Sequence, residues 1–128
     1  MNAGNTGIIE ELCAEDMVEH EEFPGLEQTR AGVKQWFDIM RAAFPDLHMR
    51  VEHMVGEGDL VIAHGYMSGT HQGSFMGLPP THRKIEFPFA DIVRFGEDGL
   101  AAEHWGVGDS GMMLQQLGVV PAGVPAAG

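Results

Sequence analysis

Residues 84–107 constrain the fold most narrowly, because they predict two long strands joined by a short turn. Apolar residues alternate along the first strand and share one of its faces: Ile85, Phe87, Phe89, Val93 and Phe95. Asp91 falls on that same face, since side chains two residues apart point to the same side of a strand. The sequence GEDG then turns the chain into a second strand, LAAEHWGV. A hairpin of this kind must bury one face, and here that face includes a carboxylate.

The rest of the chain predicts helices that cover such a sheet. Residues 29–44 form the clearest helical pattern, and Pro45 ends it. Its apolar residues recur at steps of three and four: Val33, Trp36, Phe37, Met40 and Phe44. Two further strands are expected over residues 47–55 and 60–71, a short helix that includes Cys13 over residues 8–14, a short extended piece over 16–23, and a last helix over 110–117. The prediction is an α+β fold whose inner sheet face encloses a pocket against the long helix.

Length and composition favour one compact domain, predicted over residues 8–118 with a flexible tail at 119–128. The 128 residues include 7 basic and 19 acidic side chains, a net charge of -12, which disfavours nucleic acid and anionic membranes as partners. The single cysteine rules out a disulfide within the chain, and no apolar run reaches membrane-spanning length. We therefore expect a soluble, cytoplasmic protein.

The hairpin brings Asp91 and His104 to one face in either of two registers. If GEDG is a four-residue loop, Asp91 faces His104 directly. If only Asp98 and Gly99 form the turn, Asp91 faces Gly106 and His104 lies diagonally across. Burial and mutual attraction shift the pKa values of such a pair in opposite directions, which can poise a general base near neutral pH. The alternative is a hydrogen-bonded pair that only holds the sheet together.

The sequence offers no sign of a metal or nucleotide site. Its seven histidines include no H-E-x-x-H motif, and there are no paired cysteines. A phosphate-binding G-x-x-x-x-G-K-[ST] loop is also missing. We expect neither a metal nor a cofactor.

Several stretches resemble the SnoaL-like polyketide cyclase family, within the nuclear-transport-factor-2-like superfamily. They include GVKQWFDIMRAAFPDL, DIVRFGEDGLAAEHW and, as the most specific part, residues 69–71 through 77–81, and the resemblance spans residues 8–118. It implies a cone-shaped α+β barrel, with a strongly curved, mostly antiparallel sheet wrapped around a long helix. It also implies a deep apolar pocket, a hydrophobic small-molecule ligand and a homodimer. The family normally has a helix of several turns before NAGNTGIIEEL, so we expect the pocket of this chain to be closed differently.

The resemblance also suggests site residues. Ring cyclases of the family carry a catalytic aspartate two residues after the histidine that matches His104, and Gly106 stands at that position. A histidine of the preceding strand matches Asp91, so the carboxylate has either moved across the hairpin or the activity is gone. The position of His20 points into the pocket mouth in the family, which makes it the third catalytic candidate, although a surface histidine is the alternative. The expected substrate-contacting side chains, or else core side chains, are Trp36, Phe37, Met40 and Phe89.

Together these features predict a cofactor-independent enzyme that uses general acid/base chemistry on a hydrophobic, carbonyl-bearing small molecule. A cyclase, isomerase or hydrolase would fit. The alternative is a non-catalytic module on the same fold, for small-molecule binding or for dimerisation.

Overall fold

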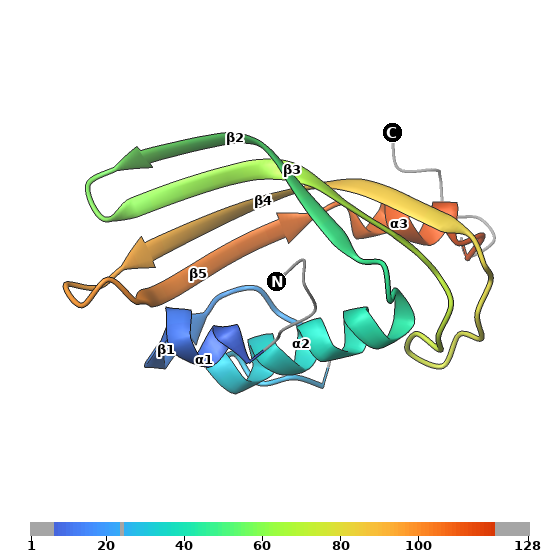
Figure 1. Ribbon diagram of the computed structural model, residues 1–128, viewed down its shortest axis with the longest axis horizontal. Coiled ribbons are helices and arrows are strands. Elements are labelled where there is room, and N and C mark those ends of the chain that lie inside the picture. Colours follow the sequence, from blue (N-terminus) through green and yellow to red (C-terminus); the bar gives the residue numbers. More distant parts are fainter. Residues whose placement is uncertain (1–6, 24, 120–128) are drawn as a thin grey trace.

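The computed structural model describes residues 7–23 and 25–119, so the predicted tail lies outside the described residues except for Val119. Five strands form one curved sheet in the order β1-β5-β4-β3-β2 (Figure 1). The strands are β1 (Cys13–Glu19), β2 (His48–Glu57), β3 (Leu60–Thr70), β4 (Lys84–Phe95) and β5 (Ala101–Gly108). Strand β1 pairs with β5 in parallel, whereas the other neighbours pair antiparallel. The mostly antiparallel α+β fold is therefore confirmed.

Three helices accompany the sheet: α1 (Ile8–Leu12), α2 (Arg30–Ala43) and α3 (Ser110–Gln116). The Thr29 hydroxyl accepts a hydrogen bond from the Gly32 amide at 3.3 Å, which caps α2 at the predicted start. Met40 on α2 and Phe44 just after the helix are almost fully buried against β3 and β4 residues such as Met67. Figure 1 shows α1 and α2 together on one side of the sheet, with α3 near its other end. None of the helices in the described part of the chain is long and apolar enough to cross a membrane.

The first predicted helix was too long. Helix α1 ends at Leu12, and Cys13 begins β1 by pairing with Ala101 of β5. Pairing with a strand some 90 positions away along the chain cannot be seen in local helical periodicity, so tertiary context overrides the local helical preference here.

Burial raises the pKa of the half-buried Cys13 thiol, and Arg30 opposes that shift.

Strand β4 has the predicted bounds, and the hairpin register follows the second alternative where it matters. Asp91 faces Gly106, and His104 faces Val93, diagonal to Asp91. Nearer the turn, a bulge shifts the register, so that Phe95 faces Ala101. Asp91 and His104 remain on the same face of the sheet, because the bulge lies between these residues and the turn.

Residues 69–81 end strand β3 and form most of the loop that leads to β4. The ring nitrogen Nδ1 of the fully buried His71 accepts a hydrogen bond from the Thr81 amide at 3.1 Å and lies 2.9 Å from the Thr81 hydroxyl. Asp46 accepts hydrogen bonds from both the amide and the hydroxyl of Thr70. The contacts between His71 and Thr81 join the two ends of the β3–β4 loop, and Asp46 ties the end of β3 to the turn before β2, so these residues have a structural role.

The far end of the β2–β3 hairpin leaves large apolar side chains in solvent. The exposed apolar side chains are Val51, Met54, Val55, Leu60 and Ile62.

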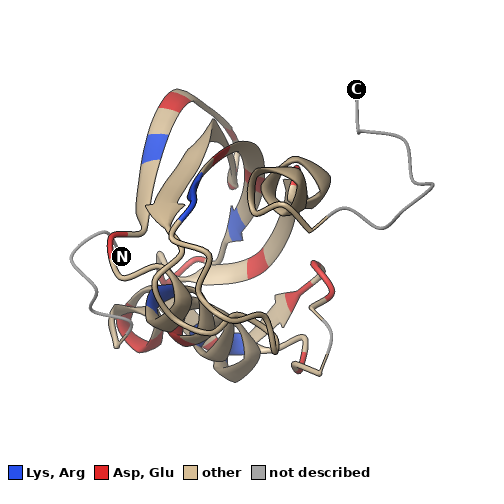
Figure 2. Cartoon of the chain, turned by 90° about the vertical axis from the view of Figure 1, so that its right-hand side faces the viewer, with Lys and Arg blue, Asp and Glu red and all other residues tan. Residues whose placement is uncertain are grey.

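Figure 2 shows the acidic residues spread over helices, strands and loops. The homodimer stays a prediction.

Candidate functional site

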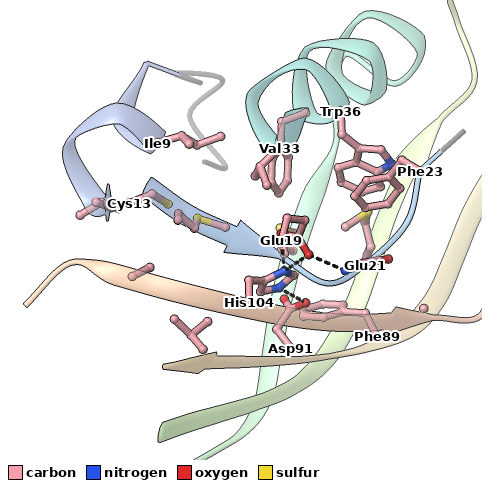
Figure 3. Close-up of a pocket in the computed structure, with 18 of the residues that line it drawn as sticks. Ile9, Cys13, Glu19, Glu21, Phe23, Val33, Trp36, Phe89, Asp91 and His104 are labelled. Atoms are coloured by element: carbon pink, nitrogen blue, oxygen red, sulfur yellow. Dashed lines mark hydrogen bonds and ion pairs between the residues drawn. The ribbon is translucent and has the colours of Figure 1, made fainter. Parts of the chain in front are cut away.

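A cavity of about 250 Å³ lies between the curved sheet and the helices α1 and α2 (Figure 3). Apolar side chains make most of its wall, among them Ile9, Met17, Val33, Trp36, Phe87 and Phe89. Four ionisable side chains gather at one place in that wall: Glu19, Glu21, Asp91 and His104. A mostly apolar cavity with a few convergent polar groups is the usual form of a small-molecule site.

His104 lies between two carboxylates. Its Nε2 is 3.0 Å from an Asp91 oxygen, and its Nδ1 is 2.7 Å from Glu19 (Figure 3). Asp91 comes from β4, His104 from β5 and Glu19 from the last position of β1. The parallel pairing of β1 with β5 sets Glu19 opposite His104, which completes a carboxylate–imidazole–carboxylate triad.

The two carboxyl groups favour the protonated form of His104 at neutral pH. Burial disfavours the imidazolium, but hydrogen bonds to Asp91 and Glu19 and their negative charge raise the pKa of His104 to about 10. His104 therefore donates a hydrogen bond from each ring nitrogen, one to each carboxylate. Neither nitrogen is left to act as a base near neutral pH, and the Asp91 carboxylate beside Nε2 is the candidate base.

Glu19 and Glu21 are residues of the candidate site that the sequence reasoning missed. Glu19 is only 1% exposed, and its oxygen accepts a hydrogen bond from the Glu21 amide at 2.9 Å. Burial raises the pKa of the Glu21 carboxyl, with Asp91 and Glu19 adding to the shift and His104 opposing it. One signal was available for Glu19: it shares the buried face of β1 with Met17, as Asp91 shares the face of its apolar neighbours.

The structure separates the other predicted site residues. Trp36, Phe37 and Phe89 line the cavity. Met40 is 1% exposed and packs in the core, outside the set of cavity-lining residues.

His20 is also outside the cavity-lining set. Its Nε2 lies 2.8 Å from Glu103, and its ring stacks on Trp105 with centroids 4.7 Å apart. Trp105 follows His104 in β5, so its side chain points to the face of the sheet opposite the cavity. The contacts with Trp105 and Glu103 therefore place His20 on the outer side of β5.

Three of the site residues could in principle hold a cation. Ligand atoms of Glu19, Glu21 and His104 lie within 4.8 Å of one another. A protonated imidazole has no free lone pair for a metal. A cation would thus have to displace the proton that joins His104 to Glu19, and the donor set fits an ion-pair network better than a metal centre.

Comparison with known proteins identifies the fold and the family. The family model described as SnoaL-like polyketide cyclase matches residues 1–117. A search of curated protein sequences found no match.

Solved structures agree with the family match. IdmH of Streptomyces antibioticus, described as a proposed polyketide cyclase, is 36% identical with a TM-score of 0.77, over 92% of this chain and 90% of its own. AclR of Streptomyces galilaeus, described as a proposed hydroxylase, is 30% identical with a TM-score of 0.82, over 97% and 76%. TsrD of Streptomyces laurentii is 26% identical with a TM-score of 0.81, over 93% and 87%. The chain belongs to the SnoaL-like polyketide cyclase family.

Proposed function

We propose that this protein is a cofactor-independent enzyme that moves a proton next to the carbonyl group of a hydrophobic small molecule. The observation that carries the proposal is the His104 ring, held between Glu19 and Asp91 in the wall of an apolar cavity. General acid/base catalysis needs a positioned proton donor or acceptor within reach of the substrate, and a carboxylate can serve as one. The description of IdmH as a proposed polyketide cyclase supports chemistry on small molecules of this kind.

In the proposed reaction, Asp91 takes a proton from the carbon next to the carbonyl. The electron pair of the broken C–H bond forms the enolate, and its negative charge moves to the carbonyl oxygen. His104 holds Asp91 in place through the 3.0 Å hydrogen bond, and Glu19 fixes the far side of the ring. The enolate carbon then attacks a second carbonyl of the same molecule, and the alkoxide that forms takes the proton back from Asp91, which closes a ring. In a β,γ-unsaturated ketone, Asp91 instead returns the proton to the γ-carbon, which moves the double bond.

The cavity wall supports a hydrophobic substrate. Trp36, Phe37 and Phe89 present aromatic surface beside the charged triad. Burying apolar surface contributes roughly 25 cal/mol per Å², so binding energy would come from the substrate's carbon skeleton. The triad would contribute mainly to the chemical step.

This proposal is tested by following deuterium incorporation into two ketones in D₂O by mass spectrometry. We expect the protein to accelerate exchange in bicyclic 2-tetralone over the buffer rate, and to leave acetone at its buffer rate because acetone offers too little apolar surface. The variant Asp16→Asn removes an exposed carboxylate of the same strand as Glu19 and serves as the control, with unchanged activity.

Binding is followed separately through quenching of Trp36 fluorescence. Quenching by 2-tetralone and related bicyclic ketones without any exchange above the buffer rate would contradict the proposal. That result would favour the non-catalytic binding module.

A further inference from the structure

The site contains a space that only a glycine at position 106 leaves open. A Cβ atom placed on Gly106 would lie 2.2 Å from Glu21 Oε1, 2.8 Å from His104 Cε1 and 3.0 Å from Asp91 Oδ1. Three functional side chains thus surround one point above the backbone of β5. Any side chain at position 106 would displace the Glu21 carboxylate, whose oxygen is the nearest of the three.

Glu21 is held at this point by the same network that orients the base. Its amide donates to Glu19, which in turn accepts from His104. Gly106 pairs with Asp91 across strands β4 and β5. The Glu21 carboxylate lies next to Gly106 and is therefore close to Asp91. Figure 3 shows the four ionisable side chains gathered at one end of the cavity.

The proposed reaction also needs a proton donor, a role that suits a second carboxyl group. When Asp91 removes the carbon-bound proton, negative charge develops on the carbonyl oxygen, and a nearby acid lowers the barrier by supplying a proton there. Both N–H groups of His104 are already engaged by Asp91 and Glu19. Glu21 lines the same cavity, and none of the hydrogen bonds described for the chain engages its carboxylate.

We propose that Glu21 is the general acid of this site and that Gly106 is the residue that admits its carboxyl group. The inference rests on the proposed function. Asp91 takes the carbon-bound proton, the electron pair forms the enol double bond, and the Glu21 proton passes to the carbonyl oxygen. Return of both protons, with deuterium from D₂O replacing hydrogen on carbon, restores the enzyme without any further reactant.

The surroundings raise the pKa of the Glu21 carboxyl. The charged groups facing it are Glu19 from β1, Asp91 from β4 and His104 from β5. The cavity residues contributed by α2 are apolar: Val33, Trp36 and Phe37. Burial and the two carboxylates raise the pKa of Glu21 against the opposing effect of His104, so the donor form persists to higher pH than in an ordinary glutamate.

The test measures kcat/KM for 2-tetralone exchange from pH 5 to 9 in wild type, Glu21→Gln, Gly106→Ala and the control Glu22→Gln. Glutamine keeps the shape of Glu21 but has no acidic proton, so we expect a loss of roughly 10²-fold or more. The fall in rate that wild type shows above the pKa of Glu21 should also disappear. Gly106→Ala should cause a comparable loss that is not additive with Glu21→Gln, whereas Glu22→Gln, in an exposed neighbour, should behave as wild type.

The outcomes separate the two proposals. Exchange by wild type with an unchanged rate and pH profile in Glu21→Gln would overturn the role of Glu21 and leave the proposed function standing. No exchange by wild type would overturn the proposed function and this inference with it. Carboxyl-¹³C NMR adds a substrate-free readout: Glu21 should titrate above the range of ordinary glutamates in wild type and move back toward it in Gly106→Ala, and an ordinary value in wild type would contradict the inference.

Discussion

Asp91→Asn is expected to lower the enzymatic rate of deuterium exchange by roughly 10²–10⁴-fold, the usual contribution of general acid/base catalysis. Asparagine has nearly the same shape as aspartate, and its side-chain oxygen can still accept the hydrogen bond from His104 Nε2. It cannot take up the substrate proton. The loss should therefore appear in kcat while the affinity for 2-tetralone, followed by Trp36 fluorescence, changes little.

The control for this loss is a circular dichroism spectrum that matches wild type at the assay temperature, because removing the Asp91 charge also lowers the stability that the ion pair with His104 supplies. Asp16→Asn provides the matched control on the outer face of β1, with full activity expected. If Asp91→Asn exchanges 2-tetralone at the wild-type rate, Asp91 is not the base.

His104→Ala is expected to lower the free energy of unfolding at pH 7 by about 3–5 kcal/mol, because it leaves a buried charge without its partner. Glu19 is 1% exposed and lies 2.7 Å from the ring that this substitution removes. Urea denaturation measures the loss.

His20→Ala is the matched control for this prediction, since it removes another histidine–carboxylate pair near the surface. Its contact with Glu103 is solvated, so the loss from that ion pair should be much smaller than the loss in His104→Ala. Adding Glu19→Gln to His104→Ala removes the unpaired charge and should restore part of the lost stability. A His104→Ala variant as stable as His20→Ala would contradict the charged triad.

The stability effect of His104 depends on pH in a defined direction. The pKa of His104 is raised in the fold, from 6.5 to about 10, so the folded protein binds a proton that the unfolded chain releases within this window. The stabilisation is fully present below pH 6.5 and is lost as the pH rises through about 10. The difference between wild type and His104→Ala should accordingly shrink from pH 7 toward pH 10.

The local pattern of the sequence predicted the hairpin half of the site. Alternation along β4 placed Asp91 on the apolar face, and both plausible registers kept His104 on that face. The bulge near Ala101 did not disturb this result, because it falls between the turn and His104. Helix α2 was similarly accessible, since its apolar stripe and the Thr29 cap are local features.

The other half of the site depends on a long-range pairing that no local pattern reveals. Glu19 and Glu21 belong to the acidic run EHEE, which is typical of a solvated segment. Only the parallel pairing of β1 with β5 turns Glu19 toward His104 and carries Glu21 over Gly106. The same pairing sets His20 against Glu103 and Trp105, away from the cavity where the resemblance had suggested it.

The measurement that tests the charged triad most directly is a ¹⁵N NMR titration of the histidine side chains, which needs no substrate. Of the seven histidines, His104 should stay an imidazolium through pH 8 and titrate near pH 10, and in Asp91→Asn its pKa should fall. A His104 that titrates near 6.5 in wild type would contradict the account, because Asp91 would then lack the cation that orients it.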